Sequence, residues 1–344
     1  MYGNKKLNLV VDMFGCPNRC LHCWLGHMPN KRMEDGADRL IMDYFSPFFD
    51  RIAFYSWMRE PDYCSDYQAR WAKDVALSKN TVPERFELAS FYRIVRDEAY
   101  IPFLKSVGVK KVQLTFFGMK ATQDRYVGRK GAYEEVMLAS DLLTDSGIVP
   151  RWQCFINEEN KDEIVQLLHL SEELKLAERC AAFGGTFKFF VHEGSCEGEN
   201  RKLYPIRIRK DHIPEELIPY YLDHPELKTE KELCAALGGS TEHEVPHNDD
   251  GIVLYVANND DLFFNFAHMR PEWRIGNLKE DPVEELVRRA VEEDIPALQK
   301  ACGITLGELV RRYGDPLSER VFSEGDYRMY LLNTYLEKTQ GDAV

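Results

Sequence analysis

The sequence has no long hydrophobic run, no excess of basic residues and no signal-peptide pattern, and each absence excludes a class of protein. No apolar stretch reaches the roughly 18 residues that a membrane-crossing helix needs. Lys and Arg total 44 against 57 Asp and Glu, a net charge of -13, so a general nucleic-acid binder with a basic face is not expected. The N-terminal stretch has only a short apolar segment and no small-residue cleavage site, which favours a cytoplasmic protein.

Internal repeats and low-complexity tracts are also lacking, and the 344 residues suffice for two domains. The hydrophobic share of 44% allows a sizeable core. Nine cysteines are present, yet structural disulfides are not expected in a reducing compartment. The positions of these cysteines therefore need another explanation.

Three of the cysteines lie within eight residues, at Cys16, Cys20 and Cys23 in CPNRCLHC. Three thiolates close together can hold three irons of a [4Fe–4S] cluster and leave the fourth iron open to a substrate or cofactor. Two alternatives are a zinc site completed by His22 or His27 and a chance grouping. The other six cysteines are too scattered for a second cluster.

The C-x3-C-x2-C spacing resembles the signature of the radical S-adenosylmethionine (radical SAM) superfamily. The resemblance implies one [4Fe–4S] cluster on the three cysteines, with SAM bound at the unique iron. It further implies that an external reductant such as flavodoxin or ferredoxin supplies the electron that cleaves SAM to a 5′-deoxyadenosyl radical. His22 stands at the aromatic-like position of the motif and Trp24 follows the last cysteine, so both are candidates for SAM binding.

Strand and helix patterns alternate along residues 1–195 and predict parallel β/α units. The predicted strands cover residues 7–13, 51–58, 85–90, 111–118, 149–157 and 186–192. The predicted helices cover residues 67–78, 91–107, 133–144 and about 160–176, the last with a capping box of Asn160 and Glu163. Six such units fit an α/β fold with a partial (β/α)6 TIM-like barrel, which is also the fold that the resemblance implies. Chemistry in such barrels sits at the C-terminal ends of the strands.

The last three predicted strands each carry one apolar and one more polar face. Helices must cover the apolar face, so the polar face is expected to line the lumen. The alternative is that these side chains lie at strand ends in water. The candidates for binding a polar substrate are Gln113, Arg151, Gln153, Lys188 and His192, and Thr115 is a candidate for a hydrogen bond to SAM.

A second resemblance to the SAM site follows the second predicted strand. Met58 and Arg59 replace the glycines of the family's Gly-Gly-Glu, whereas Glu60 and Pro61 match. The resemblance implies that Glu60 accepts a hydrogen bond from the methionyl amine of SAM. A surface glutamate beside a turn proline is the alternative.

A third stretch, residues 122–131, resembles the family's His-Asp-x-x-Arg-Gly sequence, in which the arginine pairs with the SAM carboxylate. Gln123 replaces the histidine here and Val127 stands at the arginine position. Because a guanidinium group suits a carboxylate, Arg125 or Arg129 is expected to take over that role.

Residues 196–344 resemble a SPASM/twitch extension, which is predicted as an α+β domain that covers the barrel mouth. The resemblance rests on Cys234, on a hairpin near residues 251–255, and on residues 275–278 before a helix that Asp281 caps and Pro282 opens. Where the module would carry cluster cysteines, the chain has residues 263–266 (FFNF), so no auxiliary cluster is expected. A last helix is expected over residues 326–338.

These features predict a radical SAM enzyme acting on a polar small molecule such as a sugar, nucleoside or amino-acid derivative. Cys16 lies so near the N-terminus that no leader-peptide recognition domain is expected before it. With no auxiliary cluster to accept an electron, a redox-neutral epimerisation, rearrangement, elimination or decarboxylation fits best. Epimerisation needs a hydrogen donor, for which Cys64, Cys154 and Cys196 are candidates, although free cysteines are mostly small buried hydrophobes.

Two other functions remain open at the level of the sequence. One is a radical SAM maturase of a ribosomally made peptide, whose recognition domain would be a separate protein. The other is an iron–sulfur or zinc protein without catalysis.

Overall fold

The computed structural model of the chain describes residues 5–11, 15–25, 30–56, 59–85, 87–196, 198–222, 227–245, 251–264 and 269–339. Some positions used in the sequence analysis lie outside these ranges: His27, Met58, residues 265 and 266 of the FFNF segment, and residues 12, 13, 57 and 86 of the predicted strands. The strands form a five-stranded sheet, a three-stranded sheet and a two-stranded sheet. They are β1 (Lys6–Val11), β2 (Arg51–Tyr55), β3 (Lys111–Phe116), β4 (Val149–Phe155), β5 (Lys188–His192), β6 (Lys228–Thr229), β7 (Ile252–Val256), β8 (Asp261–Phe263), β9 (Arg274–Asn277) and β10 (Val321–Phe322).

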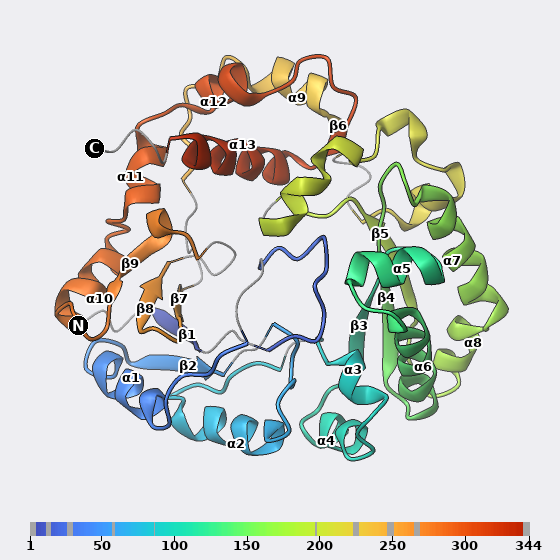
Figure 1. The fold of residues 1–344 in the computed structure, drawn as a ribbon, viewed down its shortest axis with the longest axis horizontal. Helices are drawn as coiled ribbons and strands as arrows, with labels where there is room; N and C mark the ends of the chain where they lie inside the picture. The colour runs from blue at the N-terminus through green and yellow to red at the C-terminus, as the bar shows by residue number, and fades with distance from the viewer. Residues whose placement is uncertain are drawn as a thin grey trace.

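Most helices lie on the outside of the two larger sheets, and α9, α12 and α13 form a separate group (Figure 1). The α-helices are α1 (Ala37–Phe45), α2 (Tyr67–Leu77), α3 (Phe91–Ile94), α4 (Tyr100–Ser106), α5 (Lys120–Val127), α6 (Ala132–Asp145), α7 (Lys161–Glu173), α8 (Leu176–Ala181), α9 (Glu230–Leu237), α10 (Val283–Val291), α11 (Pro296–Cys302), α12 (Leu306–Tyr313) and α13 (Glu324–Lys338). None of the helices in the described ranges is both long and apolar enough to cross a bilayer.

The barrel wall is partial, as predicted, and consists of two groups of parallel strands. β1 pairs in parallel with β2 on one side and with β7 on the other, and β3, β4 and β5 form the second parallel group. In Figure 1 the two sheets lie on opposite sides of a ring of elements. The family-like α/β barrel fold is therefore present, with one wall strand, β7, supplied by the C-terminal part of the chain.

The predicted strand at residues 85–90 does not form in the described part of that segment. Among the described residues, a backbone hydrogen bond links it to β3 from the Gln113 N–H to the Glu87 carbonyl at 2.7 Å. Both ends of the segment are engaged elsewhere: Arg85 pairs with Asp62, and the Ser90 hydroxyl caps α3 by accepting the Arg93 N–H. Side-chain contacts that the β-pattern does not reveal therefore override strand formation here.

The helix predicted over residues 91–107 is two short helices, α3 and α4. Proline lacks an N–H and is tolerated only in a first helical turn, which is where Pro102 lies in α4. The Asp97 carboxylate accepts the Ala99 N–H at 3.0 Å in the turn between the two helices. The prediction was right for residues 91–94 and 100–106 and wrong for the turn at residues 95–99 between them.

The predicted capping box at the start of α7 is absent, because both of its side chains bind elsewhere. The Asn160 amide donates to the carbonyls of Phe117 and Phe155 at 2.8 Å each. Glu163 accepts the Met119 N–H at 2.6 Å. These two residues therefore fasten the C-terminal ends of β3 and β4 together rather than the helix end.

The predicted cap of α10 also needs correction. The helix begins at Val283 with Pro282 in the cap position, and no side chain caps it. Asp281 instead accepts the Asn277 N–H at 2.8 Å at the end of β9. The carboxylate closes the turn before the helix.

One hydrophobic core joins residues from both parts of the chain. It contains Leu7 and Leu9 of β1, Phe54 of β2 and Leu254 of β7, all fully buried, together with side chains of α1, α10, α11 and α13. A second core fills the space between the β3–β4–β5 sheet and its helices. The division of the chain at residue 195 stays a prediction.

Candidate active site

The loop after β1 carries the three clustered cysteines, and a single asparagine fastens its start. The Asn30 side-chain oxygen accepts the N–H groups of Gly15 and Cys16 at 3.1 and 3.2 Å, and its amide donates to the Cys16 carbonyl at 3.4 Å. The Glu60 N–H also donates to the Gly15 carbonyl at 3.1 Å. Contacts from two later segments thus fix the position of the first cysteine.

The second half of the loop rests on the end of α5. The N–H groups of Arg19 and Leu21 donate to the carbonyls of Val127 and Tyr126 at 2.9 and 2.8 Å. Gly128 follows with φ at +72°, and a Cβ there would lie 2.9 Å from the Arg19 carbonyl oxygen. Only glycine meets both demands, so the stretch that resembles a SAM-binding sequence is in contact with the cysteine loop.

The three cysteines border one cavity of about 580 Å³. Burial raises the pKa of the Cys16 thiol to about 12, and nearby Glu60 adds to the rise. Burial also raises the pKa of Cys20, helped by the charges of Cys16 and Cys23. Bound iron would stabilise the thiolates that this environment disfavours.

The donor set fits an iron–sulfur cluster better than zinc. Within the described ranges, no three His, Cys, Asp or Glu side chains are close enough to share a single metal ion. Three thiols around a cavity that also holds room for a ligand match a cluster with one open iron. The residues present therefore fit the group that the motif implies.

Most predicted site residues line the same cavity. Besides the cysteines, the cavity is lined by His22, Trp24, Glu60, Gln113, Thr115, Gln153 and His192, with Asn18, Leu25, Arg59, Pro61, Leu88, Ala89, Phe91, Phe117, Val127, Phe155, Ser195, Asn200 and Asp326 around them. Side chains of β3, β4 and β5 therefore border the same cavity as the cysteine loop.

Glu60 is buried, which excludes the alternative of a surface glutamate. Burial raises its pKa to about 7, although Ser90 and the Tyr92 N–H bond the carboxylate and favour its charged form. Its Oε1 atom has no hydrogen-bond partner among the described residues. A buried acceptor beside the cysteines that lacks a donor fits the amine of a bound SAM.

A chain of polar side chains crosses the ends of β3, β4 and β5. The Gln113 amide contacts the Gln153 oxygen at 2.5 Å, and the Gln153 amide contacts His192 Nε2 at 2.5 Å. His192 Nδ1 lies 3.2 Å from the Gly194 nitrogen. Burial lowers the pKa of His192 to about 4, which keeps the ring neutral. This row offers several hydrogen-bonding groups without charge.

His22 lies against two aromatic rings of the barrel. Its ring centroid is 4.1 Å from Phe117 and 4.6 Å from Phe155. Burial lowers its pKa to about 3, and its Nδ1 atom has no partner among the described residues. Trp24 borders the cavity but is 39% exposed. Both residues are therefore near the cysteines, and His22 is the more enclosed.

The two arginines predicted to bind the SAM carboxylate do not line the cavity. Arg125 is exposed and pairs with Glu159 at 3.0 Å. Arg129 forms two bonds to Glu135, at 2.8 and 2.5 Å, and one to the Asn18 side chain at 2.9 Å. Arg129 thus holds the cysteine loop from outside through Asn18, and its charge is already paired.

Two predicted substrate-binding residues, Arg151 and Lys188, are not among the residues that line the cavity. Arg151 pairs with Glu87, and its guanidinium lies 5.3 Å from the centre of the Phe190 ring. Lys188 is exposed, with its ammonium 5.1 Å from the same ring. Gln113 is in register with Arg151 and yet lines the cavity, so the alternation along a strand does not by itself tell which residues reach the cavity.

The three candidate hydrogen donors have different surroundings. Cys154 is fully buried in the second hydrophobic core, and burial raises its pKa well above the usual range. Cys64 is partly exposed and does not border the cavity. Cys196 borders a small adjoining pocket that shares His22 and Asn200 with the main cavity.

Sequence reasoning missed the residues that fasten or complete the site. Asn30 accepts a hydrogen bond from the start of the cysteine loop, and Asn18 links the loop to Arg129. Ser195 and Asn200 from the segment after β5, and Asp326 of α13, line the cavity. A further missed residue is Gln123, which accepts the Phe117 N–H at 2.7 Å and donates to the Thr115 carbonyl at 3.0 Å. The sequence offered one signal for these residues, which is that Asn18 lies within the cysteine motif itself.

Comparisons with known proteins give one curated relative and several structures of similar fold. No protein-family model matches the chain. Fe-coproporphyrin III synthase of Methanosarcina barkeri (strain Fusaro / DSM 804) is 26% identical over 202 residues, which cover 53% of this chain and 49% of that protein. The match thus spans about half the length of this curated relative.

Two solved structures share the fold along nearly the whole chain. Native anSMEcpe with bound AdoMet and Kp18Cys peptide has a TM-score of 0.51 at 12% identity, covering 97% of each chain. Native anSMEcpe with bound AdoMet and Cp18Cys peptide has a TM-score of 0.53 at 12% identity, covering 98% of this chain and 100% of that one. The curated relative and these structural neighbours are radical SAM enzymes.

Proposed function

We propose that this chain, a radical SAM enzyme by its cysteine motif, its fold and its relatives, abstracts hydrogen from a polar small-molecule substrate held at the ends of β3, β4 and β5. The observation that carries the proposal is that the three thiols and the polar strand ends border the same cavity. Its volume of about 580 Å³ falls within the range of roughly 300–1,000 Å³ that is usual for small-molecule sites.

The chain's own residues divide the work around the bound cofactors. A [4Fe–4S] cluster and SAM, when bound, supply the 5′-deoxyadenosyl radical. Cys16, Cys20 and Cys23 hold the cluster, and Glu60 accepts a hydrogen bond from the SAM amine through its unpartnered oxygen. His22 packs beside this space with Phe117 and Phe155 and excludes water from it.

The charges of the lining favour a neutral or cationic substrate. Its acids are Glu60 and Asp326, and its one lysine or arginine is Arg59, which donates to Asn30 at 3.1 Å. The low pKa values of His22 and His192 keep both rings uncharged near pH 7. A substrate with several carboxylates would find only Arg59 as a cationic partner among the described lining residues, whereas hydroxyl, amide or amine groups would find acceptors and donors.

Cys196 is the best placed of the three cysteines to donate hydrogen in an epimerisation. The Arg207 guanidinium donates to its sulfur at 3.2 Å, yet burial raises the pKa of the thiol to about 11. The thiol thus stays protonated, which is the form that gives a hydrogen atom. A substrate radical that takes this atom leaves a thiyl radical, which the external reductant returns to the thiol with one electron and one proton.

A peptide is the second candidate substrate. The proposal is supported by the likeness to anSMEcpe, whose solved structures contain bound peptides, and which extends along nearly the whole chain. The lining of the cavity also includes Ser195, Asn200 and Asp326, which follow β5 in the chain. In this alternative a peptide side chain, and not a free metabolite, would reach the polar strand ends.

The test is substrate-stimulated SAM cleavage by the anaerobically reconstituted enzyme with dithionite. A small-metabolite fraction and a peptide fraction of cell extract are assayed separately for stimulation of 5′-deoxyadenosine formation. The proposal expects stimulation by the small-metabolite fraction, and stimulation by the peptide fraction alone would favour the alternative. The Gln153→Leu variant should lose the stimulation, about tenfold or more, while a matched Gln166→Leu change on the exposed face of α7 should keep it.

A further inference from the structure

The turn that follows Glu60 is held in an unfavourable backbone conformation. Asp62 has φ at +56°, in the left-handed region that residues with side chains seldom adopt. The turn is closed by the Tyr63 N–H, which donates to the Glu60 carbonyl at 3.2 Å. Such strain persists only where the surroundings over-determine the conformation.

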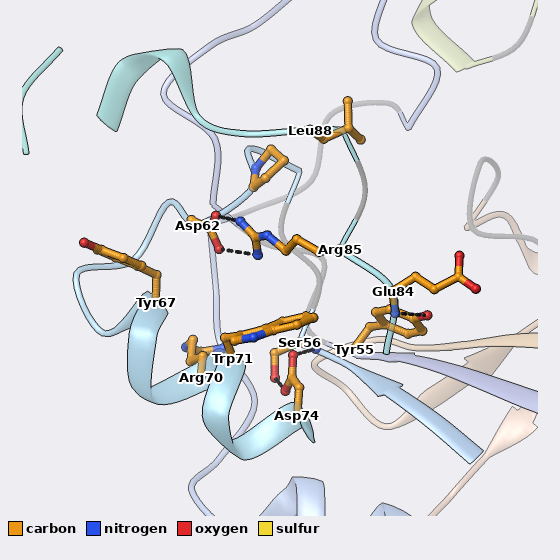
Figure 2. A pocket seen from close by; sticks show the side chains of 11 residues that line it. Tyr55, Ser56, Asp62, Tyr67, Arg70, Trp71, Asp74, Glu84, Arg85 and Leu88 are labelled. Carbon is orange, nitrogen blue, oxygen red and sulfur yellow. Dashed lines mark hydrogen bonds and ion pairs between the residues drawn. The ribbon is translucent and has the colours of Figure 1, made fainter. Parts of the chain in front are cut away.

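Two residues form hydrogen bonds to the Asp62 side chain. They are Arg85, from the segment where the third strand was predicted, and Tyr100 of α4. Arg85 offers two nitrogens to the two carboxylate oxygens, one at 3.1 Å, and Figure 2 shows the two groups facing each other. The Tyr100 hydroxyl donates to the same carboxylate at 2.5 Å. The Arg85 guanidinium lies 5.4 Å from the centre of the Trp71 ring, which limits its movement.

The backbone of the turn is held as well. Arg93 donates through Nε to the Asp62 carbonyl and through a terminal nitrogen to the Tyr63 carbonyl, both at 2.6 Å. The donors Arg85, Arg93 and Tyr100 all belong to residues 85–100, so a single segment of the chain fixes the turn.

The same network reaches the Glu60 carboxylate. The Tyr100 hydroxyl accepts the Ser90 N–H at 3.2 Å while it donates to Asp62. The Ser90 hydroxyl accepts the Arg93 N–H at 3.0 Å and bonds to Glu60. Tyr100 therefore bridges the strained turn and the residue that orients one carboxylate oxygen, and the other carboxylate oxygen is buried without a partner among the described residues.

We infer that Asp62, Arg85 and Tyr100 form a positioning clamp that aims the Glu60 carboxylate at the SAM amine. The inference rests on the proposed role of Glu60. Arg59 stands where the family resemblance places a glycine, and the clamp supplies the fixed turn geometry at this point. Asp62, Arg85 and Tyr100 are not among the residues that line the cavity, so they act through Glu60 and Ser90.

The test is a double-mutant cycle on SAM affinity in the anaerobically reconstituted enzyme. Equilibrium dialysis gives Kd for wild type, Glu60→Ala, Tyr100→Phe and the double variant, with iron content and melting temperature recorded for each. Tyr100→Phe keeps the buried ring and removes only the hydroxyl, so iron content should stay unchanged. We expect each single change to raise Kd about tenfold and the double variant to be no weaker than Glu60→Ala alone, because residues in one network are not additive.

Arg85→Lys and Arg179→Lys provide a matched pair. Lysine keeps the charge but loses the two-nitrogen contact to Asp62, so Arg85→Lys should raise Kd by several-fold. Arg179 pairs with Asp141 and Asp145 on the outer helices, at 2.8 and 2.9 Å, and its change to lysine should leave Kd as it is.

Each other outcome overturns the inference. Additive losses, or a Tyr100→Phe variant with wild-type Kd beside a weakened Glu60→Ala, would remove the clamp and leave the role of Glu60 intact. A Glu60→Ala variant with unchanged Kd would remove that role, and with it the clamp that acts through it. A fall in melting temperature or iron content with unchanged Kd would show that the clamp only stabilises the fold.

Discussion

At the scale of single residues, burial sets the protonation of several groups around β2. Asp74 of α2 is 5% exposed and receives hydrogen bonds from the Ser56 N–H and hydroxyl at 2.8 and 2.7 Å (Figure 2). Burial nevertheless raises its pKa from 3.8 to about 7, because loss of water outweighs the two bonds. The folded state therefore binds the Asp74 proton more tightly than the unfolded state does.

This raised pKa predicts a pH-dependent stability. Folded protein holds the proton up to about pH 7 and unfolded protein releases it near 3.8, so the contribution of Asp74 is fully present below pH 3.8 and is lost as pH rises toward 7. Between pH 5 and pH 8 the loss should be about 2 kcal/mol. Urea unfolding of wild type and Asp74→Asn at both pH values checks this, and an equal change in the two proteins would contradict it.

The sequence indicated the chemistry of single residues better than their partners. The alternation of β3 and β4 predicts that Gln113, Thr115 and Gln153 share a face, and these three side chains border the cavity. Arg125 and Arg129 have the right charge in a family-like stretch, but Glu159 and Glu135 on neighbouring elements take up their guanidinium groups. Spacing along one segment contains no information about acids that arrive from other segments.

At the scale of elements, α5 determines where the cysteine loop lies. The sequence did not predict this helix, because its residues were assigned to a ligand-binding stretch. The helix ends at Val127, and its last carbonyls accept the loop's N–H groups. The failed third strand has a similar cause, since its charged and hydroxyl side chains serve the turn after Glu60 and the cap of α3.

The contact between α5 and the loop predicts a difference between two glycine variants. Gly128→Ala puts a Cβ 2.9 Å from the Arg19 carbonyl oxygen in addition to a strained φ, whereas Gly131, with φ at +84°, has nothing within 4 Å. Both changes should cost about 1 kcal/mol from the backbone. Only Gly128→Ala should displace the loop and lose most of the iron after reconstitution. Equal iron content in the two variants would show that the loop does not depend on this contact.

At the scale of the whole molecule, the barrel wall depends on a strand from the C-terminal part of the chain. Leu9 of β1 is in register with Leu254 of β7, and both are fully buried in the same core. The sequence suggested a hairpin near residues 251–255 but not its place beside β1. A parallel pairing across more than 200 residues leaves no local pattern in either strand.

Removing the Leu254 side chain should therefore weaken β1 and β2 as well as β7. A large-to-small change at a fully buried leucine costs about 3 kcal/mol. Hydrogen exchange should show faster opening of the amides of β1 and β2 in Leu254→Ala than in wild type. The matched Val253→Ala change, at a partly exposed position of the same strand, should have a smaller effect. Unchanged exchange in β1 would contradict the shared core.

The central claim is that Cys16, Cys20 and Cys23 hold one [4Fe–4S] cluster at which SAM is cleaved. The most direct measurement is 5′-deoxyadenosine formed from SAM and dithionite by the anaerobically reconstituted protein, beside its variant with all three cysteines changed to alanine. The account predicts iron–sulfur absorbance and 5′-deoxyadenosine in the wild type, and neither signal in the variant. Wild-type protein with no cluster and no product, or a variant that retains both, would contradict it.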